Sequence, residues 1–174
     1  MARNCSINQY VQEISDIANA YNRTIYAIKN SNNPNNYHYI GLSQLEIEEQ
    51  IQQDILEQER LSILSLLACC EARIRYDYYR RYITKQKSKI SRALRGLYKQ
   101  YGKRIHFEST LLKEWRKYAS SAKRELDYLS EAFAYRHWLA HGRYWNLKFD
   151  TQKFDFTLMY IVVEAIIKLI QNTK

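Results

Sequence analysis

Hydrophobic residues recur every three or four positions along most of this chain, which is the spacing of one face of an α-helix. The first such pattern predicts a helix from about Ser6 to Lys29. The Asn-rich segment NSNNPNNYHYIG follows, holds the only proline and predicts a surface loop. The apolar positions of the first helix are Ile7, Val11, Ile14, Ala18, Tyr21, Ile25 and Ile28.

A second helix is predicted to begin at Ser43, because Ser43 and Glu46 have the spacing of a capping box, in which each side chain bonds the other's backbone N–H. Neither glycine nor proline interrupts the chain from there through LSILSLLACCEARIRYDYYRRY, so this helix is expected to be long. Its apolar stripe is expected to continue through Leu61, Leu64, Leu67, Ala68 and Ala72.

Three more helices complete the pattern. The third, SKISRALRGLYKQYG, ends at Gly102, and the fourth is expected from about Ser109 to His141, with Gly142 as its C-terminal cap. The fifth begins at about Asp150 and is apolar nearly all round, as expected for a helix with neighbours on every side. The prediction is an all-α, single-domain bundle of about five helices over residues 1–174.

The third helix should bury one face, and the fourth should carry an apolar stripe along its length. The expected apolar positions are Ile90, Leu94, Leu97 and Tyr101 in the third helix, and Leu112, Trp115, Ala119, Ala122, Leu126, Leu129 and Phe133 in the fourth.

The same pattern argues against a membrane protein. The run FTLMYIVVEAIIKLI is short and carries Glu164 and Lys168 at i,i+4 spacing, so it is interpreted as a buried helix. The N-terminus has no apolar signal core, and three cysteines without metal-ligand spacing favour a reducing compartment, so a cytoplasmic location is expected. Cys69 and Cys70 lie in an apolar run and are interpreted as core residues.

The net charge of +9 is concentrated in the middle of the chain. Residues up to Ala72 carry four Lys or Arg against nine Asp or Glu, whereas twelve Lys or Arg face Asp77 alone between Arg73 and Arg104. A polyanion such as nucleic acid is the natural partner for such a surface, since phosphate contacts supply most nonspecific affinity. A solvated basic face that aids solubility is the alternative, and Glu71 and Asp77 can also form ion pairs along their helix.

The stretch YRHWLAHGRYW, Tyr135 to Trp145, has the highest density of chemically useful side chains. His137 and His141 lie four residues apart and could bind a metal, but no third ligand follows, so no metal is predicted. His137 is expected near the centre of the apolar stripe and partly buried, where a hydrogen-bonded core histidine is as acceptable as a functional one. Arg136 flanks the stripe and needs a partner or an interface.

Arg136, four residues and His141, at the end of a helix that precedes the last helix of a small basic all-α protein, resemble the motif of the HEPN superfamily of nucleotide-binding domains. The resemblance implies a metal-independent endoribonuclease without cofactor, in a bacterial defence or toxin–antitoxin system. It also implies a homodimer with a composite active site, in which Arg136 and His141 converge across a two-fold axis, and a possible antitoxin or defence-system partner.

The chemistry of these residues fits that expectation. Cleavage by the RNA 2′-OH needs proton transfer and a positive charge that stabilises the developing phosphorane. It leaves a 2′,3′-cyclic phosphate and a 5′-OH. We assign proton transfer to His141, charge stabilisation to Arg136 and support to His137. Arg143 and Tyr144 are expected to contact RNA, while Trp145 is interpreted mainly as packing.

Two other functions stay open. One is a non-catalytic HEPN-like module that binds RNA, a nucleotide or a protein through the same surface. The other is a helical interaction protein whose basic face contacts an acidic partner. No glycine-rich phosphate loop, nucleophile elbow or carboxylate cluster for two-metal catalysis is found in the sequence, which excludes several enzyme classes.

Overall fold

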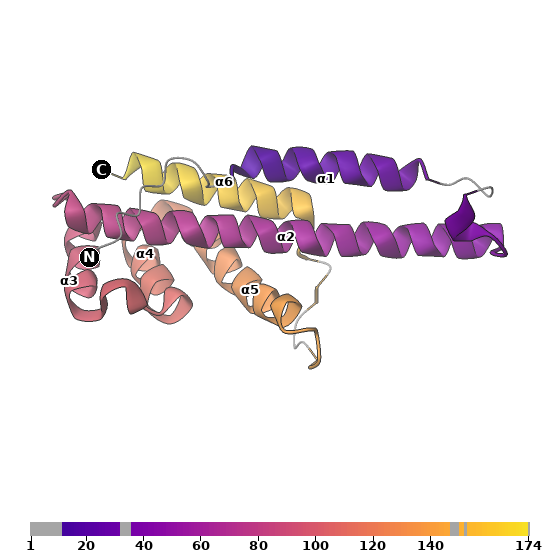
Figure 1. Cartoon of the computed structure of the whole chain (residues 1–174). Coiled ribbons are helices and arrows are strands. Elements are labelled where there is room, and N and C mark those ends of the chain that lie inside the picture. The colour runs from indigo at the N-terminus through magenta and orange to yellow at the C-terminus, as the bar shows by residue number, and fades with distance from the viewer. Residues whose placement is uncertain (1–11, 32–35, 147–149, 152, 174) are drawn as a thin grey trace, which may run out of the picture. The chain divides into compact units, whose positions relative to one another are not determined.

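The computed structural model describes residues 12–31, 36–146, 150–151 and 153–173, and these residues form helices and turns without a strand (Figure 1). This confirms the all-α prediction. Six α-helices are present in the described residues, joined by short 3₁₀ and π-helical turns. They are α1 (Ile14–Lys29), α2 (Gln44–Ile83), α3 (Lys89–Tyr101), α4 (Lys113–Tyr118), α5 (Lys123–Ala140) and α6 (Phe156–Asn172).

The chain divides into two compact units, Met1–Ser62 and Ile63–Lys174, here called unit 1 and unit 2. The division falls inside α2, so the first part of this helix belongs to unit 1 and the second part to unit 2. The expectation of a single domain over residues 1–174 stays a prediction.

In unit 1, the described part of the chain places the start of α1 at Ile14. The sequence predicted a start at about Ser6. Gln12 is not helical, and Glu13 has an extended backbone, with φ −79° and ψ 145°, as is usual for the residue before a helix. Ile7 and Val11 of the predicted stripe lie outside the described residues, while Ile14 is buried.

The capping box at the start of α2 is confirmed. The Ser43 N–H donates to Glu46 Oε2 at 2.7 Å, and the Glu46 N–H donates to Ser43 Oγ at 3.4 Å. The loop before it contains a 3₁₀ turn, Tyr37–Tyr39, that buries Tyr39. Unit 1 therefore has a small core of its own, which comprises Tyr39, Ile47 and Ile51 with Ile28 and Ile55 packed against them.

In unit 2, α2 buries a different face from the predicted one. Leu67 is buried as expected, but Leu61 in the preceding part of the helix is 54% exposed, and Ala68 and Ala72 are exposed as well. The larger side chains decide which face turns inward, because they remove more apolar surface from water. The buried positions of this part are Ile63, Leu66, Leu67, Cys69, Cys70, Ile74, Asp77, Tyr78 and Arg81.

The third predicted helix is confirmed as α3. Ser88 caps its start by accepting a hydrogen bond from the Ser91 N–H, and Gly102 ends it with a φ of +57°, which favours glycine. Ile90 and Leu94 are buried as predicted, whereas Tyr101 is largely exposed at the end of the helix.

The fourth predicted helix is interrupted, so the expectation of about five helices is replaced by six in the described residues. A π-helical turn at Phe107–Leu112 leads into α4. Ala119, with φ −114° and ψ 62°, ends α4 and interrupts the helix before α5 begins. Two serines follow Ala119, and serine side chains favour non-helical backbone. The predicted stripe is nevertheless buried at every position from Leu112 to Phe133.

The last helix, α6, begins at Phe156 rather than at Asp150, because the side chain of Asp155 caps it by accepting from the Leu158 N–H at 2.8 Å. It contacts α5, and one face is buried. Leu158 and Ile161 are exposed, so the expectation of neighbours on every side is wrong. Among the described residues, no helix combines the length and the hydropathy needed to cross a membrane.

Three helices of unit 2 meet at one buried guanidinium. Arg81 of α2 is 0% exposed and bonds the carboxylate of Asp77 on the same helix. Its Nη1 donates to Ser91 Oγ of α3 at 2.7 Å, and its Nη2 donates to the Ile170 carbonyl of α6 at 3.1 Å. The indole of Trp115 in α4 lies 5.1 Å from the guanidinium carbon. This residue therefore ties α2, α3 and α6 together.

Asp77 is 2% exposed and also accepts a hydrogen bond from Arg80 at 3.0 Å. The pair with Arg80 is one of the ion pairs expected from the sequence, but its burial and the role of Arg81 were not expected. Burial raises the pKa of the Asp77 carboxyl, and the bonds to Arg81 and Arg80 oppose that rise. The carboxyl thus depends on its arginine partners to stay ionised.

Replacement of Arg81 should therefore be far more costly than replacement of its neighbour. We expect Arg81→Ala to lower the free energy of unfolding by about 3–5 kcal/mol, because it leaves the buried Asp77 carboxylate with only the partly exposed Arg80 as a partner and removes the bonds to α3 and α6. The control Arg80→Ala removes a partly exposed partner and should cost less than about 1 kcal/mol. Urea unfolding of the purified variants measures both, and equal losses would contradict a central role for Arg81.

Candidate functional site

The candidate residues lie at the C-terminal end of α5 and in the turn that follows it. His141 caps the helix, Gly142 has a φ of +76°, and Arg143 also has a left-handed backbone with φ +60°. The Arg143 N–H donates to the Trp138 carbonyl at 3.1 Å, which is the bond that closes a Schellman motif. The predicted role of Gly142 as the C-terminal cap is confirmed, and the chain reverses sharply here.

Trp138 holds this turn against the helix. Its indole Nε1 donates to the Trp145 carbonyl at 2.8 Å, and the Arg143 guanidinium carbon lies 5.9 Å from the centre of its ring. One side chain on the last turn of α5 thus fixes both the backbone and a cation of the following segment. Because hydrogen bonds and packing restrict it, the turn can present its side chains in a defined geometry.

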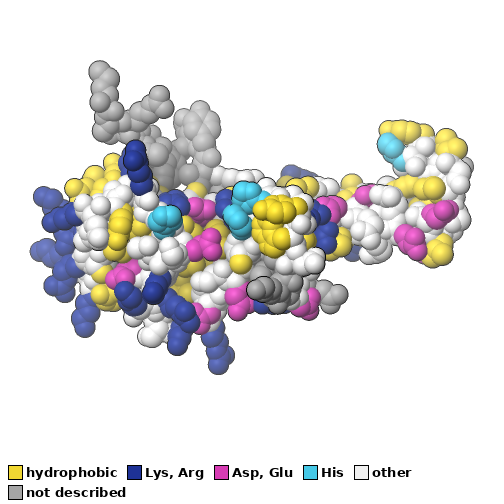
Figure 2. All heavy atoms as spheres, turned by 90° about the horizontal axis from the view of Figure 1, so that it is seen from below, with side chains coloured by type: hydrophobic (Ala, Val, Ile, Leu, Met, Phe, Trp, Pro, Cys, Tyr) yellow, Lys and Arg dark blue, Asp and Glu magenta, His cyan; other side chains and the backbone are white. Residues whose placement is uncertain are grey.

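The last turn of α5 brings two imidazole rings together. The ring centroids of His137 and His141 are 4.2 Å apart, with an angle of 53° between the planes, and the Trp145 ring lies 5.6 Å from that of His137. Tyr144 is 82% exposed and meets Trp145 edge to face at 4.7 Å. We call His137, His141, Arg143, Tyr144 and Trp145 the helix-end cluster. Figure 2 shows histidine beside hydrophobic side chains on one face of the molecule.

His137 is exposed, so the expectation that it is partly buried near the centre of the apolar stripe is wrong. The last buried residue of α5 is Tyr135, and the side chains in the final turn of the helix are half-buried or exposed. This excludes a buried core histidine at position 137 and leaves both imidazoles accessible to water.

Arg136 points elsewhere. Its Nη2 lies 3.6 Å from Glu71 Oε2 of α2, and its guanidinium carbon is 5.9 Å from the centre of the Phe133 ring. In the part of the chain that is described, no hydrogen bond or ion pair joins Arg136 to His141. The expectation that Arg136 requires a partner is met by Glu71, which also binds Arg75 at 2.7 Å.

A cavity of about 420 Å³ opens beside Arg136. It brings His106 near Arg136, although no role for this histidine is predicted from the sequence. No sequence signal links the two, because thirty positions of chain and a helix break separate them. The cavity is lined by Glu71, Arg75, His106, Phe107, Glu108, Ser109, Phe133 and Arg136.

Metal binding is not supported at the helix-end cluster. Among the described residues, no group of three or more His, Cys, Asp or Glu side chains is placed to hold a metal ion. His137 and His141 alone provide two ligands, and a stable site for zinc takes three or four.

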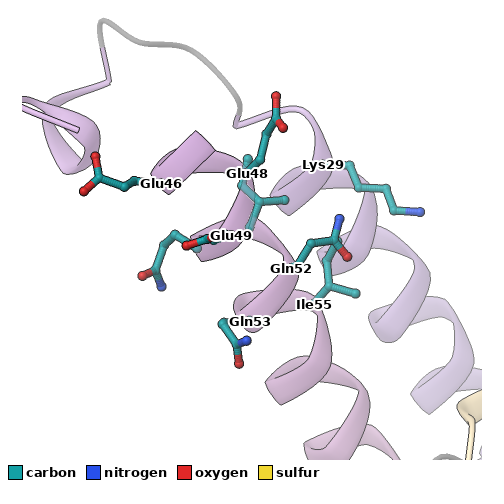
Figure 3. A pocket seen from close by; sticks show the side chains of 9 residues that line it. Lys29, Glu46, Glu48, Glu49, Gln52, Gln53 and Ile55 are labelled. Atoms are coloured by element: carbon teal, nitrogen blue, oxygen red, sulfur yellow. The ribbon is translucent and has the colours of Figure 1, made fainter. Parts of the chain in front are cut away.

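Unit 1 has a larger hollow, of about 960 Å³, between the end of α1 and the start of α2 (Figure 3). Lys29 contributes one positive charge, whereas Glu46, Glu48 and Glu49 contribute negative ones. The sign of this charge is opposite to the one that RNA requires. The hollow is therefore not part of the candidate site.

Comparisons of the chain with protein-family models, with curated proteins and with solved structures found no match. The resemblance to the HEPN superfamily thus stays a prediction based on Arg136 to Tyr144.

Loss of the Trp138 hydrogen bond should loosen the turn. We expect Trp138→Phe to lower the free energy of unfolding by at least about 0.5–1.5 kcal/mol, because the bond to the Trp145 carbonyl is lost and the phenyl ring is smaller than the indole. Tyr144→Phe is the control, since this ring is mostly exposed and should change stability little. Urea unfolding compares the two, and a Trp138→Phe variant as stable as wild type would contradict the role given to the indole.

Proposed function

We propose that this protein is a HEPN-type, metal-independent endoribonuclease that cleaves RNA at the helix-end cluster. The observation that carries the proposal is the pair of exposed imidazoles, with ring centroids 4.2 Å apart, next to the half-buried ring of Trp145 and the exposed ring of Tyr144. Imidazole accepts and donates protons near neutral pH, and two of them side by side suit a reaction that needs both a base and an acid.

The reaction is an internal displacement at phosphorus. The 2′-oxygen of a ribose attacks the adjacent phosphorus while a neutral imidazole takes the 2′-OH proton. The bond from phosphorus to the 5′-oxygen of the next nucleotide breaks, and an imidazolium gives that oxygen a proton. The products are a 2′,3′-cyclic phosphate and a 5′-OH. We assign the essential proton transfer to His141, with His137 as its neighbour in the exchange.

Two arginines can supply the positive charge that stabilises the anionic phosphorane. Arg143 belongs to the same turn as His141, and its backbone is fixed by the bond to Trp138. Arg136 is bound to Glu71 in its own subunit. We propose that a second copy of the chain supplies Arg136 across a two-fold axis, so that the homodimer forms a composite site. Tyr144, with its exposed ring, would stack on an unpaired base.

A second candidate function is RNA binding without cleavage. The ion pair between Arg136 and Glu71 favours it, because a cation already neutralised by a carboxylate contributes less to a phosphorane. In this case the same surface would hold RNA but leave its backbone intact. We propose a role in bacterial defence or in a toxin–antitoxin system only for the nuclease and not for the second candidate function.

Cleavage of total RNA and purified tRNA in EDTA tests the nuclease. We expect wild type to cut with cyclic phosphate ends and His141→Ala to lose at least about a hundredfold in rate, because proton transfer contributes on this scale. His38→Ala, an exposed histidine in unit 1, is the control and should cut as wild type does. His106→Ala tests the cavity beside Arg136.

The result separates the candidates. Equal cutting by wild type and His141→Ala would overturn the assignment, and loss in His106→Ala alone would move the site to the cavity beside Arg136. Binding of RNA without any cutting by wild type would favour the second candidate. Unchanged urea unfolding of His141→Ala is needed to exclude a structural effect.

Mixing two inactive variants tests the composite site. In a dimer formed by Arg136→Ala and His141→Ala chains, one of the two sites keeps both groups if they come from different subunits. Random pairing after mixing should then restore about one quarter of the wild-type rate. No recovery, under conditions where exchange of subunits is demonstrated by mass, would contradict a site shared between subunits.

A further inference from the structure

The turn after α2 and the helix α3 carry cations that no carboxylate neutralises. The sequence between Lys85 and Arg104 contains eight Lys or Arg and no Asp or Glu. The nearest preceding acid, Asp77, is buried and bonded to Arg81 and Arg80. Within the described residues, none of these eight cations takes part in an ion pair. Their positive charge is therefore available to an anion from outside.

Four of these cations line a groove of about 520 Å³ between the end of α2 and α3. Figure 2 shows Lys and Arg gathered over one end of unit 2. A groove lined by charge of one sign binds an extended polyanion better than scattered surface charges do, because several phosphates can be contacted at once. The lining residues are Tyr82, Ile83, Lys85, Arg92, Arg95, Gly96 and Lys99.

Gly96 leaves room in this groove. It lies in the middle of α3, where glycine is less favourable than alanine, and a Cβ placed on it would meet no atom within 4 Å. No contact inside the protein therefore requires glycine at this position. The absence of a side chain lets a ligand backbone approach the helix between Arg92 and Lys99.

Aromatic side chains lie next to the cations. Tyr82 lines the groove, and one face of its ring stacks on Tyr98 at 4.2 Å between centroids. Lys103 lies 5.2 Å from the centre of the Tyr79 ring. Cations that follow the backbone together with aromatic rings for bases are the features that bind single-stranded nucleic acids.

The walls of the groove are held rigidly. Arg81 directly precedes Tyr82, and its bond to Ser91 joins α2 to α3 beside the groove. A preformed groove loses less conformational freedom when it binds a chain.

We propose that this groove binds the phosphate backbone of single-stranded RNA, with Lys85, Arg92 and Lys99 on phosphates and Tyr82 stacked on a base. The proposal rests on the nuclease function to the extent that the groove would hold the substrate cut at the helix-end cluster. A membrane surface is less suited to the site, because lipid headgroups on a flat bilayer do not follow a groove and leave no role for Tyr82.

The first test changes the charge of the groove floor without removing any native cation. Gly96→Glu and Gly96→Gln insert side chains of the same size, and only Glu adds a negative charge. We expect Gly96→Glu to bind fluorescein-labelled oligouridylate about tenfold more weakly than Gly96→Gln, because like charges repel in the groove. Fluorescence anisotropy in EDTA measures both, and equal affinities would overturn the proposal.

The second test counts phosphate contacts. The variant Lys85→Gln/Arg92→Gln/Lys99→Gln should flatten the slope of log affinity against log salt by about 2, since each phosphate contact contributes about 0.7 for single strands. The control Lys113→Gln/Lys123→Gln/Arg124→Gln removes the same charge from α4 and α5. Equal losses in the two variants would mean that only net charge matters and would overturn the groove.

Two further outcomes separate this proposal from its alternatives. Tighter binding to phosphatidylserine vesicles than to oligouridylate, lost in the groove variant, would overturn RNA as the ligand. His38→Ala, an exposed position in unit 1, should bind oligouridylate as wild type does. If wild type binds through the groove but never cuts RNA, the proposed nuclease fails while the groove stands. If wild type cuts RNA and the groove variant binds unchanged, the groove alone fails.

Discussion

The buried guanidinium of Arg81 is the interaction on which unit 2 depends. Desolvation of a charged group costs several kcal/mol, and the cost is recovered only when buried partners accept its hydrogen bonds in good geometry. Asp77, Ser91 and the Ile170 carbonyl provide these acceptors from three helices. Because apolar packing alone tolerates sliding of one helix past another, a directional bond at the meeting point selects one arrangement of α2, α3 and α6.

This buried pair also determines the charge of the surface. Asp77 is the only acid between Arg73 and Arg104, and the interior removes it from the solvent. The sequence from Lys85 to Arg104 adds no acid of its own, and four of its cations line the groove between α2 and α3. Asp77 therefore helps to stabilise the core as the partner of Arg81, and its burial leaves the nearby surface positive and suited to phosphate.

The helix-end cluster is set by a different constraint, the way in which α5 stops. Gly142 adopts a positive φ, the chain reverses, and the indole of Trp138 fixes the segment after it. His137 and His141 then meet on the exposed last turn, whereas Arg136, one residue away from His137, faces Glu71. Adjacent positions on a helix point about 100° apart, so one motif serves two surfaces. A composite site in a dimer is the arrangement that would reunite them.

Local signals in the sequence determined a large part of this fold. The Ser43–Glu46 capping box, the ends of α3 and α5 at Gly102 and Gly142, and the buried positions from Leu112 to Phe133 were all predicted correctly, because caps and periodicity depend on residues within one or two turns. The adjacency of His137 and His141 also follows from i,i+4 spacing.

Tertiary structure alone decided the rest. Four outcomes depend on residues that are distant in the chain: which face of α2 is buried, the exposure of His137, the partner of Arg136 and the burial of Arg81. Periodicity identifies an apolar face but not where the covering helix ends, and charge patterns do not reveal which ion is desolvated. Those outcomes are set by the packing of α2 to α6, whose free energy is shared among many residues at once.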